Sequence, residues 1–478
     1  MPFSNSSSVL DIVSRFIGVF NGYFYSYILI ILLLVFGVYF TVRTGFVQFR
    51  FFGEQLRVVT EKPDDKKSVS SFQALMLSTA SRVGTGNIIG VSTALCLGGF
   101  GSVFWMWVVA IIGGALAFVE STLAQIFKKK GEDGSYGGSA YYIEAALKNR
   151  KIAVLFSALL IMTYGIGFNM LTSYNLQSTF SQYSFYNPSS SPVIIGVITA
   201  GIVGFCFLGG GKRIVRVTSV LVPFMGVVYI ITAFVIVALN FKVIPDVLKT
   251  VFSEAFDFES VFGGFSGSCV MYGIKRGLLS NEAGVGSAPN ASAAAKVSHP
   301  VKQGLVQMLS VSIDTLLICT ATAFMCMCSG VEPSEEISGA AYVQLSVQNS
   351  LGSIGPLIIT VAMVLFAFTT LIGNIYYVEK CVTYIIGKEP DRIISNVTKI
   401  LQASFTFAGS VLGADLLWNI ADLTMGLMIL INVPVIGLLS RYAFEALDDY
   451  EKQRKAGENP EFSVRSINLP YRVDYWKE

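Results

Sequence analysis

One apolar stretch of this chain, from Leu75 to Leu97, is interrupted at its centre by small, polar and charged residues. The interruption reads Ser81-Arg82-Val83-Gly84-Thr85-Gly86-Asn87. The stretch is long enough to cross a hydrocarbon core of about 30 Å. Because lipid offers no hydrogen-bond partners, a helix broken at this depth is tolerated only where it is buried in protein or lines a wet cavity. Transporters use such breaks to hold a substrate carboxylate and a small cation, so the segment predicts transport.

The composition supports a membrane protein and argues against an enzyme. Hydrophobic residues make up 53% of the chain, and the mean hydropathy is +0.62. Charged residues make up 14%, against about 25% in soluble domains. The seven cysteines show no metal-binding or disulfide spacing, and the single histidine, His299, falls between apolar segments. We therefore expect no metal- or histidine-dependent active site within the membrane.

The apolar segments predict an all-α integral membrane protein with eleven transmembrane helices. Residues 1–23 have the apolar spacing of an amphipathic helix at the membrane surface, ahead of the first span. The predicted spans are 24–42, 70–98, 102–127, 152–177, 193–209, 214–240, 258–280, 302–328, 353–385, 394–413 and 417–440.

The distribution of Lys and Arg predicts the orientation of these spans. Every second loop is rich in basic residues, and the loops between them carry few or none. Basic loops remain on the cytosolic side, so the N-terminus is predicted outside and the C-terminus inside. The basic segments, with 30 of the 34 Lys and Arg residues, are 43–69, 128–151, 211–216, 275–302, 380–399 and 441–478.

A second predicted break, Gly263–Ser268, interrupts the span at 258–280. With the first span set aside, the two broken spans are the first and sixth of ten, which is the pattern of a five-plus-five inverted-repeat transporter. The alternative is that glycines merely allow close helix packing, which is common in membranes. We expect four regions: 1–69 (surface helix, extra span and loop), 70–240 (first repeat), 241–440 (second repeat) and 441–478 (cytosolic tail).

Several sequence strings resemble the alanine/glycine:cation symporter family. The resemblance implies a leucine-transporter-type fold with one extra N-terminal helix, and sodium-driven, occasionally proton-driven, uptake of a small neutral amino acid. The strings are Gly84-Thr85-Gly86-Asn87-Ile88, Phe104-Trp105-Met106-Trp107, Tyr136-Gly137-Gly138, Tyr141-Tyr142-Ile143, the run from Gly273 to Pro289, His299-Pro300 and Phe366-Ala367-Phe368-Thr369-Thr370.

An amino acid zwitterion needs donors for its carboxylate and acceptors for its ammonium group. The amides of Thr85, Gly86 and Asn87 lie at the predicted break, where a helix N-terminus favours an anion. The unwound second break supplies free carbonyls for the ammonium, with aromatic residues at the side-chain end; these residues are Phe262, Gly263, Gly264, Phe265 and Ser266.

Two positions depart from the family's usual pattern and bear on substrate size. Many members of the family carry Gln where this chain has Thr172, and Trp where it has Asn374. Replacing Trp with Asn opens room and adds an amide group. The resemblance therefore also allows a larger or more polar substrate, such as glutamine.

The coupling ion is expected to be sodium, a hard cation that takes oxygen ligands. By resemblance to the fold's common sodium site, the hydroxyls of Thr369 and Thr370 join the backbone carbonyls of Ala80, Val83 and Phe366. The alternative is that these threonines only bond back to a carbonyl one turn earlier.

Two charges fall within predicted spans, Arg82 and Asp314. Each costs at least about 2.5–3.5 kcal/mol at the bilayer centre, so it is usually paired or functional. Arg82 is a further departure from the family, and its guanidinium could take the place of a second cation. The alternative is a structural ion pair with Asp314, Glu120 or Glu282.

These observations predict a sodium symporter for alanine, glycine or serine in the cytoplasmic membrane, working by alternating access. The alternatives are a carrier of glutamine or another larger neutral amino acid, and a proton-coupled or sodium-independent exchanger. A channel would need a ring of repeated filter residues, which the sequence does not contain. The expected partners are the amino acid, sodium and lipid, with no nucleic acid.

Overall fold

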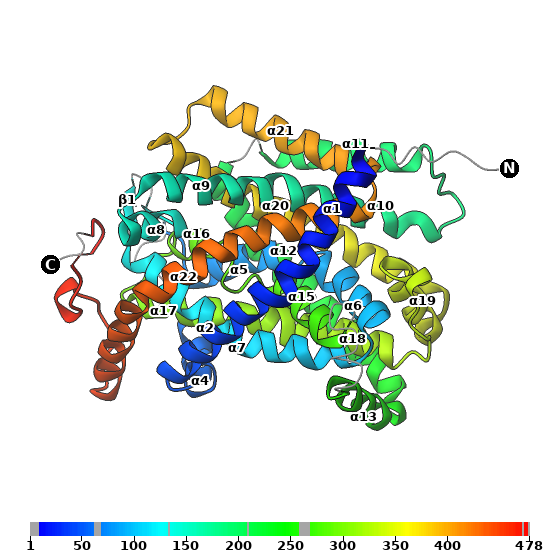
Figure 1. Cartoon of the computed structure of the whole chain (residues 1–478), viewed down its shortest axis with the longest axis horizontal. Coiled ribbons are helices and arrows are strands. Elements are labelled where there is room, and N and C mark those ends of the chain that lie inside the picture. Colours follow the sequence, from blue (N-terminus) through cyan, green and yellow to red (C-terminus); the bar gives the residue numbers. More distant parts are fainter. Residues whose placement is uncertain are drawn as a thin grey trace.

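The computed structural model describes residues 9–61, 68–131, 134–207, 210–257, 268–470 and 473–476, and this part of the chain is nearly all helical (Figure 1). The α-helices of nine or more described residues are α1 (Val9–Tyr23), α2 (Ile30–Arg43), α4 (Phe52–Thr60), α5 (Ser71–Arg82), α7 (Gly101–Ile126), α8 (Ser139–Leu147), α9 (Arg150–Leu160), α10 (Phe168–Ser178), α11 (Ser191–Phe207), α12 (Gly210–Leu239), α13 (Ile244–Ala255), α15 (Cys269–Asn281), α17 (Pro300–Val311), α19 (Ala340–Leu351), α20 (Gly355–Ile386), α21 (Arg392–Val411) and α22 (Ala414–Lys455).

Shorter elements connect or continue these helices. The short α-helices are α3 (Val47–Arg50), α6 (Val91–Gly98), α16 (Pro289–Ser292) and α18 (Thr320–Met327). The π-helical segments are η1 (Phe24–Leu29), η2 (Gly86–Gly90), η3 (Ile161–Gly167) and η7 (Ser312–Cys319). The 3-10 turns are η4 (Thr179–Gln182), η5 (Phe241–Val243), η8 (Glu335–Ile337), η9 (Gly352–Ile354) and η10 (Val464–Ser466). Strands β1 (Lys129–Gly131) and β2 (Gly134–Tyr136) form an antiparallel hairpin.

Seven helical stretches of the described residues are long and apolar enough to cross a membrane, so the chain is a multi-pass membrane protein. The predicted spans at 70–98, 193–209 and 394–413 fall on shorter, interrupted or less apolar helices, and the span at 258–280 lies partly outside the described residues. The count of eleven and the five-plus-five repeat therefore stay predictions. The seven stretches are Ser14–Arg43, Gly101–Ile126, Arg150–Gln182, Arg213–Leu239, Pro300–Met327, Ala340–Ile386 and Ala414–Lys455.

The N-terminal region differs from the expected surface helix followed by a separate span. Helix α1 continues through η1 into α2, so one helical stretch runs from Val9 to Arg43. Two buried polar groups hold this junction against α22: the Asn21 Nδ2 group donates to the Asn419 carbonyl (2.8 Å), and the Tyr25 hydroxyl donates to the Asp422 carbonyl (2.8 Å). Because the junction is tied to a neighbouring helix, the chain does not turn onto the membrane surface there.

Helix α7 lies at the centre of the fold, with α15 and α17 packed along it. The contact with α15 depends on two glycines four residues apart, Gly273 and Gly277. A Cβ on Gly273 would lie 2.4 Å from the Ser102 carbonyl oxygen, and one on Gly277 would lie 3.3 Å from the Met106 Cα. At these two positions the glycines allow close packing, as they do in other membrane helix pairs.

Two segments that we predicted as loops contain helices, α13 and α19. Helix α13 begins with a proline in its first turn and presents an apolar face to α7. Its C-terminal end is fixed there, because the Glu254 carboxylate accepts from the Gly101 amide (3.0 Å) and the Ala255 carbonyl accepts from Trp105 Nε1 (3.2 Å). The short apolar face of such a helix is easily mistaken for loop sequence.

The molecule is elongated, and α22 shows how far apart its ends are (Figure 1). With 42 residues, this helix is about 60 Å long. We call the end that carries α13, α19 and the start of α22 the vestibule end. The end that carries β1, α8 and the C-terminal segment is the tail end. The predicted orientation places the tail end in the cytosol.

Candidate functional site

The predicted break in the first core span is confirmed. Helix α5 begins with a capping box at Ser70 and ends at Arg82, Val83 is extended (φ −75°, ψ 90°), and helical structure resumes at Gly86. The Gly84 amide donates to Asn87 Oδ1 (2.8 Å) instead of the Ala80 carbonyl one turn back. The Ala80 carbonyl therefore loses its usual helical donor in the middle of the molecule.

Helix α20 approaches this break so closely that Gly84 can only be glycine. A Cβ at Gly84 would lie 2.1 Å from the Thr370 hydroxyl oxygen, and a Cβ at Gly373 would lie 2.8 Å from the Ser81 nitrogen. Both contacts join α20 to the last turn of α5 and the residues after it. A ligand held here would therefore touch both segments.

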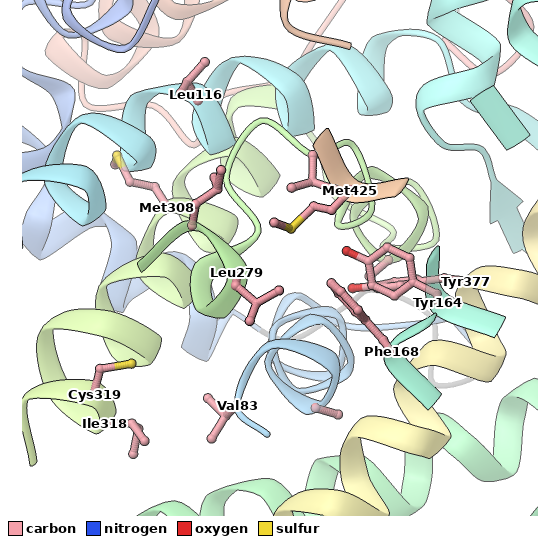
Figure 2. Close-up of a cluster of buried hydrophobic side chains, with 14 of the residues drawn as sticks. Val83, Leu116, Tyr164, Phe168, Leu279, Met308, Ile318, Cys319, Tyr377 and Met425 are labelled. Carbon is pink, nitrogen blue, oxygen red and sulfur yellow. The ribbon is translucent and has the colours of Figure 1, made fainter. Parts of the chain in front are cut away.

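The break lines a small buried cavity of about 40 Å³. At 10–15 Å³ per water, this is room for roughly three water molecules. Apolar walls come from α10 and α15, and Figure 2 shows Phe168 and Leu279 in one buried cluster with Val83. The lining residues are Ser81, Arg82, Gly84, Thr85, Gly86, Phe168, Leu171, Thr172, Asn175, Leu279, Glu282 and Thr370.

The structure brings part of the predicted substrate site together. Thr85, Gly86 and Thr172 line the cavity, and Asn87 and Asn374 do not. The amides of Thr85 and Gly86 stand at the start of a helical segment, where N–H groups have no acceptor within the helix. The predicted residues Phe262, Gly263, Gly264, Phe265 and Ser266 lie outside the described residues, as does most of the second predicted break.

Asn87 is turned into a buried polar network behind the cavity. Its Nδ2 group donates to the Asp314 carboxylate (2.6 Å), and its Oδ1 accepts from Gly84. The Ser280 hydroxyl donates to the second Asp314 oxygen (2.7 Å), and so does the Thr315 hydroxyl (2.9 Å). The Asp314 side chain thus ties the break to α15 and η7 through hydrogen bonds.

Asn374 also has both ends of its carboxamide occupied. Its Oδ1 accepts from the Ser81 hydroxyl (2.8 Å), and its Nδ2 donates to Asn169 Oδ1 (3.1 Å). The residue is fully buried and connects α20 to α5 and α10. In this arrangement the Asn374 side chain supports the wall of the cavity and does not line it.

The two candidate sodium-binding threonines have different surroundings. The Thr369 hydroxyl donates to the carbonyls of Leu365 and Phe366 (3.1 Å each) and lies 3.4 Å from Met225 Sδ. This is the backward hydrogen bond that we gave as the alternative. The Thr370 hydroxyl is buried, has no hydrogen-bond partner among the described residues, and lines the cavity.

The remaining candidate sodium ligands are backbone carbonyls around the break. Ala80 belongs to the last turn of α5, Val83 is the extended residue that follows it, and Phe366 belongs to α20. All three residues are buried. The described residues contain no group of three or more His, Cys, Asp or Glu side chains suited to a metal ion, so a cation here would depend on carbonyl and hydroxyl oxygens.

Arg82 is buried (3% exposed) and makes only long hydrogen bonds, from Nη1 to the Gln307 side chain (3.3 Å) and carbonyl (3.4 Å). Its Nε and Nη2 groups have no partner among the described residues, and none of its nitrogens lies within 4.0 Å of a carboxylate there. The expected ion pair with Asp314, Glu120 or Glu282 is therefore not formed. All three carboxylates are nevertheless near enough for the Arg82 charge to act on them.

Sequence reasoning missed several residues of the cavity. Glu282 lies in a string that we quoted for the family, and we considered it only as a partner of Arg82. Its carboxylate accepts from the hydroxyls of Ser287 (2.7 Å) and Ser81 (3.4 Å). Asn175 lies one turn beyond Thr172 on α10, and the helical spacing of three could have indicated it.

A second, larger cavity of about 1000 Å³ opens at the vestibule end. Its lining includes charged residues from α15 and α22. Two of them, Lys275 and Arg276, belong to the segment 275–302 that we predicted on the cytosolic side, and the structure places them at the vestibule end, opposite the tail end. Lys275 Nζ lies 2.6 Å from the Asp422 carboxylate, and the Arg276 guanidinium lies 4.1 Å from the ring centre of Trp418. This vestibule reaches α10 at Tyr174 and Asn175.

Comparison with known proteins places the chain in a family of transporters. The model of the sodium:alanine symporter family matches residues 10–464. The chain is 41% identical to the amino-acid carrier protein AlsT of Bacillus subtilis, with 99% of this chain and 98% of AlsT covered. It is 42% identical to the probable sodium/glutamine symporter GlnT of the same species, with 98% and 96% covered. It is 35% identical to the sodium/alanine symporter AgcS of Methanococcus maripaludis, with 93% and 99% covered.

Proposed function

Since this chain belongs to the sodium:alanine symporter family, we propose that it imports alanine, glycine or serine together with sodium by alternating access. The family and the seven apolar helical stretches make it a multi-pass membrane transporter of the bacterial inner-membrane type, and not an enzyme. The leucine-transporter-type fold, with repeats at 70–240 and 241–440 and the N-terminus outside, is part of the proposal.

The observation that carries the proposal is the broken helix beside a small cavity lined by buried residues. The amides of Thr85 and Gly86 face a substrate carboxylate with the positive end of the helix dipole behind them. Thr172, Phe168 and Leu171 line the cavity from α10 and limit the space for a substrate side chain. A small amino acid fits this arrangement better than a large one.

Support for cation coupling comes from the oxygen atoms around the same break. The Thr370 hydroxyl has no partner, and the Ala80 carbonyl has lost its helical donor. With the Val83 carbonyl nearby in sequence, these atoms are suitable ligands for sodium. Thr369 and Phe366 belong to the proposed set by the family resemblance. The Thr369 hydroxyl donates to the Leu365 and Phe366 carbonyls here, so its binding of sodium requires this hydroxyl to turn towards the break.

Arg82 places a positive charge next to the break, where it acts on three buried carboxyl groups, those of Glu120, Glu282 and Asp314. We propose that the Arg82 guanidinium takes the place of a second coupling ion and leaves one sodium per transport cycle.

Uptake of labelled alanine into proteoliposomes tests the proposal. We expect accumulation with an inward sodium gradient, none with a matched potassium gradient, and competition by glycine and serine. Thr370→Val is expected to abolish sodium-driven accumulation of alanine. Thr383→Val is the matched control, because the Thr383 hydroxyl bonds only to the Glu379 carbonyl of its own helix, far from the break. Sodium-independent exchange that persists in Thr370→Val would contradict sodium coupling.

Glutamine is the second candidate substrate. The chain is as similar to the sodium/glutamine symporter of Bacillus subtilis as to its amino-acid carrier, and Thr172 offers more space than the glutamine common in the family. Displacement of labelled alanine mainly by glutamine would favour this candidate. A proton gradient that replaces the sodium gradient would favour proton coupling, which other members of the family are named for.

A further inference from the structure

Asn175 lies between the vestibule and the small cavity. Of the described residues that line either space, it is the one that lines both. Its side chain is 1% exposed, so it is almost entirely enclosed by protein. The linings of the two cavities therefore meet at this residue.

The two ends of the Asn175 carboxamide differ in their contacts. Its Nδ2 group donates to the Thr85 hydroxyl oxygen (3.1 Å), which fixes the side chain against the helix break. Its Oδ1 atom is buried and has no hydrogen-bond partner among the described residues. Buried polar atoms are nearly always paired, so an acceptor left open beside a cavity points to a ligand that donates hydrogen bonds.

The cavity presents both hydrogen-bond donors and acceptors. The Thr85 and Gly86 amides and the unpartnered nitrogens of Arg82 are donors, suited to a carboxylate. The open Oδ1 of Asn175 is an acceptor, suited to an ammonium group. Glu282 is a further acceptor in the lining, and one of its oxygens is held by the Ser287 hydroxyl (2.7 Å), whereas the Asn175 oxygen has no partner among the described residues.

We propose that Asn175 recognises the ammonium group of the transported amino acid through its Oδ1 atom. The proposal rests on the amino-acid transport proposed above and adds a specificity-determining residue to it. The bond to Thr85 places the carboxamide next to the break, whose amides are proposed to bind the carboxylate, while the recognition itself is carried by the Oδ1 atom. Amino acids with a free ammonium group are then favoured over N-methylated or deaminated analogues.

The test is the selectivity between alanine and N-methylalanine, measured as competition against labelled alanine. Asn175→Leu keeps the shape of the side chain and removes its oxygen. We expect its KM for alanine to rise about tenfold, as for the loss of one hydrogen bond to a charged group, and the preference over N-methylalanine to shrink. Asn175→Asp keeps an oxygen at this position, and we expect it to retain the preference.

Thr85→Val is the control for a purely supporting role. It removes the partner of Nδ2 and leaves the Asn175 oxygen, so we expect a lower transport rate with the preference retained. Should Asn175→Leu lower the rate and leave the preference unchanged, the recognition role is wrong. The preference for alanine over N-methylalanine can also be measured as competition for binding of labelled alanine to the purified protein. Because this measurement does not need transport, it separates a failure of sodium-driven uptake from a failure of recognition. Absence of amino-acid binding would overturn both proposals.

Discussion

The two ends of the molecule are closed to different degrees. The vestibule end holds a cavity of about 1000 Å³, with the Lys275–Asp422 ion pair on its floor. At the tail end, the segment formed by residues 456–470 and 473–476, which we call the tail segment, lies across the ends of α7 and α17. The vestibule end is therefore the hollowed one, and in an alternating-access cycle the tail-end contacts would have to separate for substrate release there.

The contacts of the tail segment are specific. The Ser298 hydroxyl donates to the Pro460 carbonyl (2.6 Å), and the Phe462 amide donates to the Ser298 carbonyl (2.9 Å). Trp476 Nε1 donates to the Gln125 carbonyl at the end of α7 (2.7 Å). From the sequence we predicted only a cytosolic tail. The aromatic residues that hold the tail segment against the helices are too far apart in the sequence to form a pattern that would have indicated this packing.

Basic side chains are buried beneath the tail segment. Lys128, which lies at the C-terminal end of α7, is fully buried with its Nζ 3.8 Å from the ring centre of Tyr475. Lys302 Nζ lies 2.6 Å from the Glu61 carboxylate and 2.9 Å from Asn459 Oδ1. An alternating-access carrier must open and close these contacts in each cycle, whereas the vestibule end is already hollowed as far as Tyr174 and Asn175.

The largest expected effect comes from truncation after Ala456. The shortened chain loses its contacts with Lys128, Lys302 and Ser298, so water can reach the start of α5 and α17. Maleimide labelling of Ser71→Cys, a buried position at that end, is expected to become about tenfold faster. Labelling of Ser338→Cys in the vestibule, in the same cysteine-free background, is the control. An unchanged rate at position 71 would show that the tail segment does not close this end.

Breaking the vestibule ion pair is expected to have a smaller effect. Asp422→Asn leaves Lys275 without its carboxylate in a site where Asp422 is 1% exposed. We expect a stability loss of about 2 kcal/mol, below the 3–5 kcal/mol of a fully buried pair because Lys275 can reach water. Thermal unfolding of the purified variant in detergent measures this loss of stability. The double variant with Lys275→Met should recover part of the loss, and strict additivity of the two changes would argue against a direct interaction.

A single hydrogen bond of the tail segment is expected to matter less. Trp476→Phe keeps an aromatic ring against Phe462 and loses the bond from Nε1 to the Gln125 carbonyl. We expect a cost of about 1 kcal/mol and a few-fold faster labelling at position 71. Trp476→Ala removes the ring contact as well, so its effects on stability and labelling should be larger than those of Trp476→Phe. Equal effects of the two variants would show that the hydrogen bond alone, and not the ring contact, contributes to stability.

The smallest effect expected is a pH dependence of the tail end. Burial lowers the pKa of His299, although the Asp449 carboxylate opposes the shift. The Nδ1 atom of His299 accepts from the Val301 amide (3.2 Å), and this bond requires an unprotonated Nδ1. With the folded pKa below the unfolded value of about 6.5, this contribution is present above pH 6.5 and is lost as the pH falls below it. The free energy of unfolding changes through this group by less than about 1.4 kcal/mol per pH unit.

His299→Asn is the control for this prediction. Asparagine keeps an N-cap acceptor for α17 and does not titrate. The unfolding temperature of the unchanged chain should fall between pH 7.5 and 5.5 more steeply than that of the variant. Parallel curves for the two proteins would show that His299 does not titrate in this range.

The sequence predicted the features that depend on local chemistry. The break after Arg82 follows from glycines and polar residues within an apolar run, and the structure confirms it. The membrane class follows from composition and repeated apolar segments. Helices α13 and α19 were missed, because short apolar faces next to long spans give little periodic signal.

The parts of the site that depend on tertiary contacts could not be predicted. The sequence placed Asn374 in the substrate pocket, and only the packing of α20 on α5 and α10 shows that its carboxamide is already occupied. The two neighbouring threonines were treated as equivalent, whereas Thr370 faces the break and Thr369 faces Met225. Asn175 was overlooked because its importance depends on the meeting of two cavities.

The most direct test of alternating access is cysteine labelling at both ends of one protein preparation. Ser338→Cys reports on the vestibule and Ser71→Cys on the tail end, each measured in sodium alone and in sodium with saturating alanine. We expect opposite changes: alanine should slow labelling in the vestibule and speed it at the tail end. Labelling that rises or falls together at both ends would contradict the account and indicate a channel-like pathway.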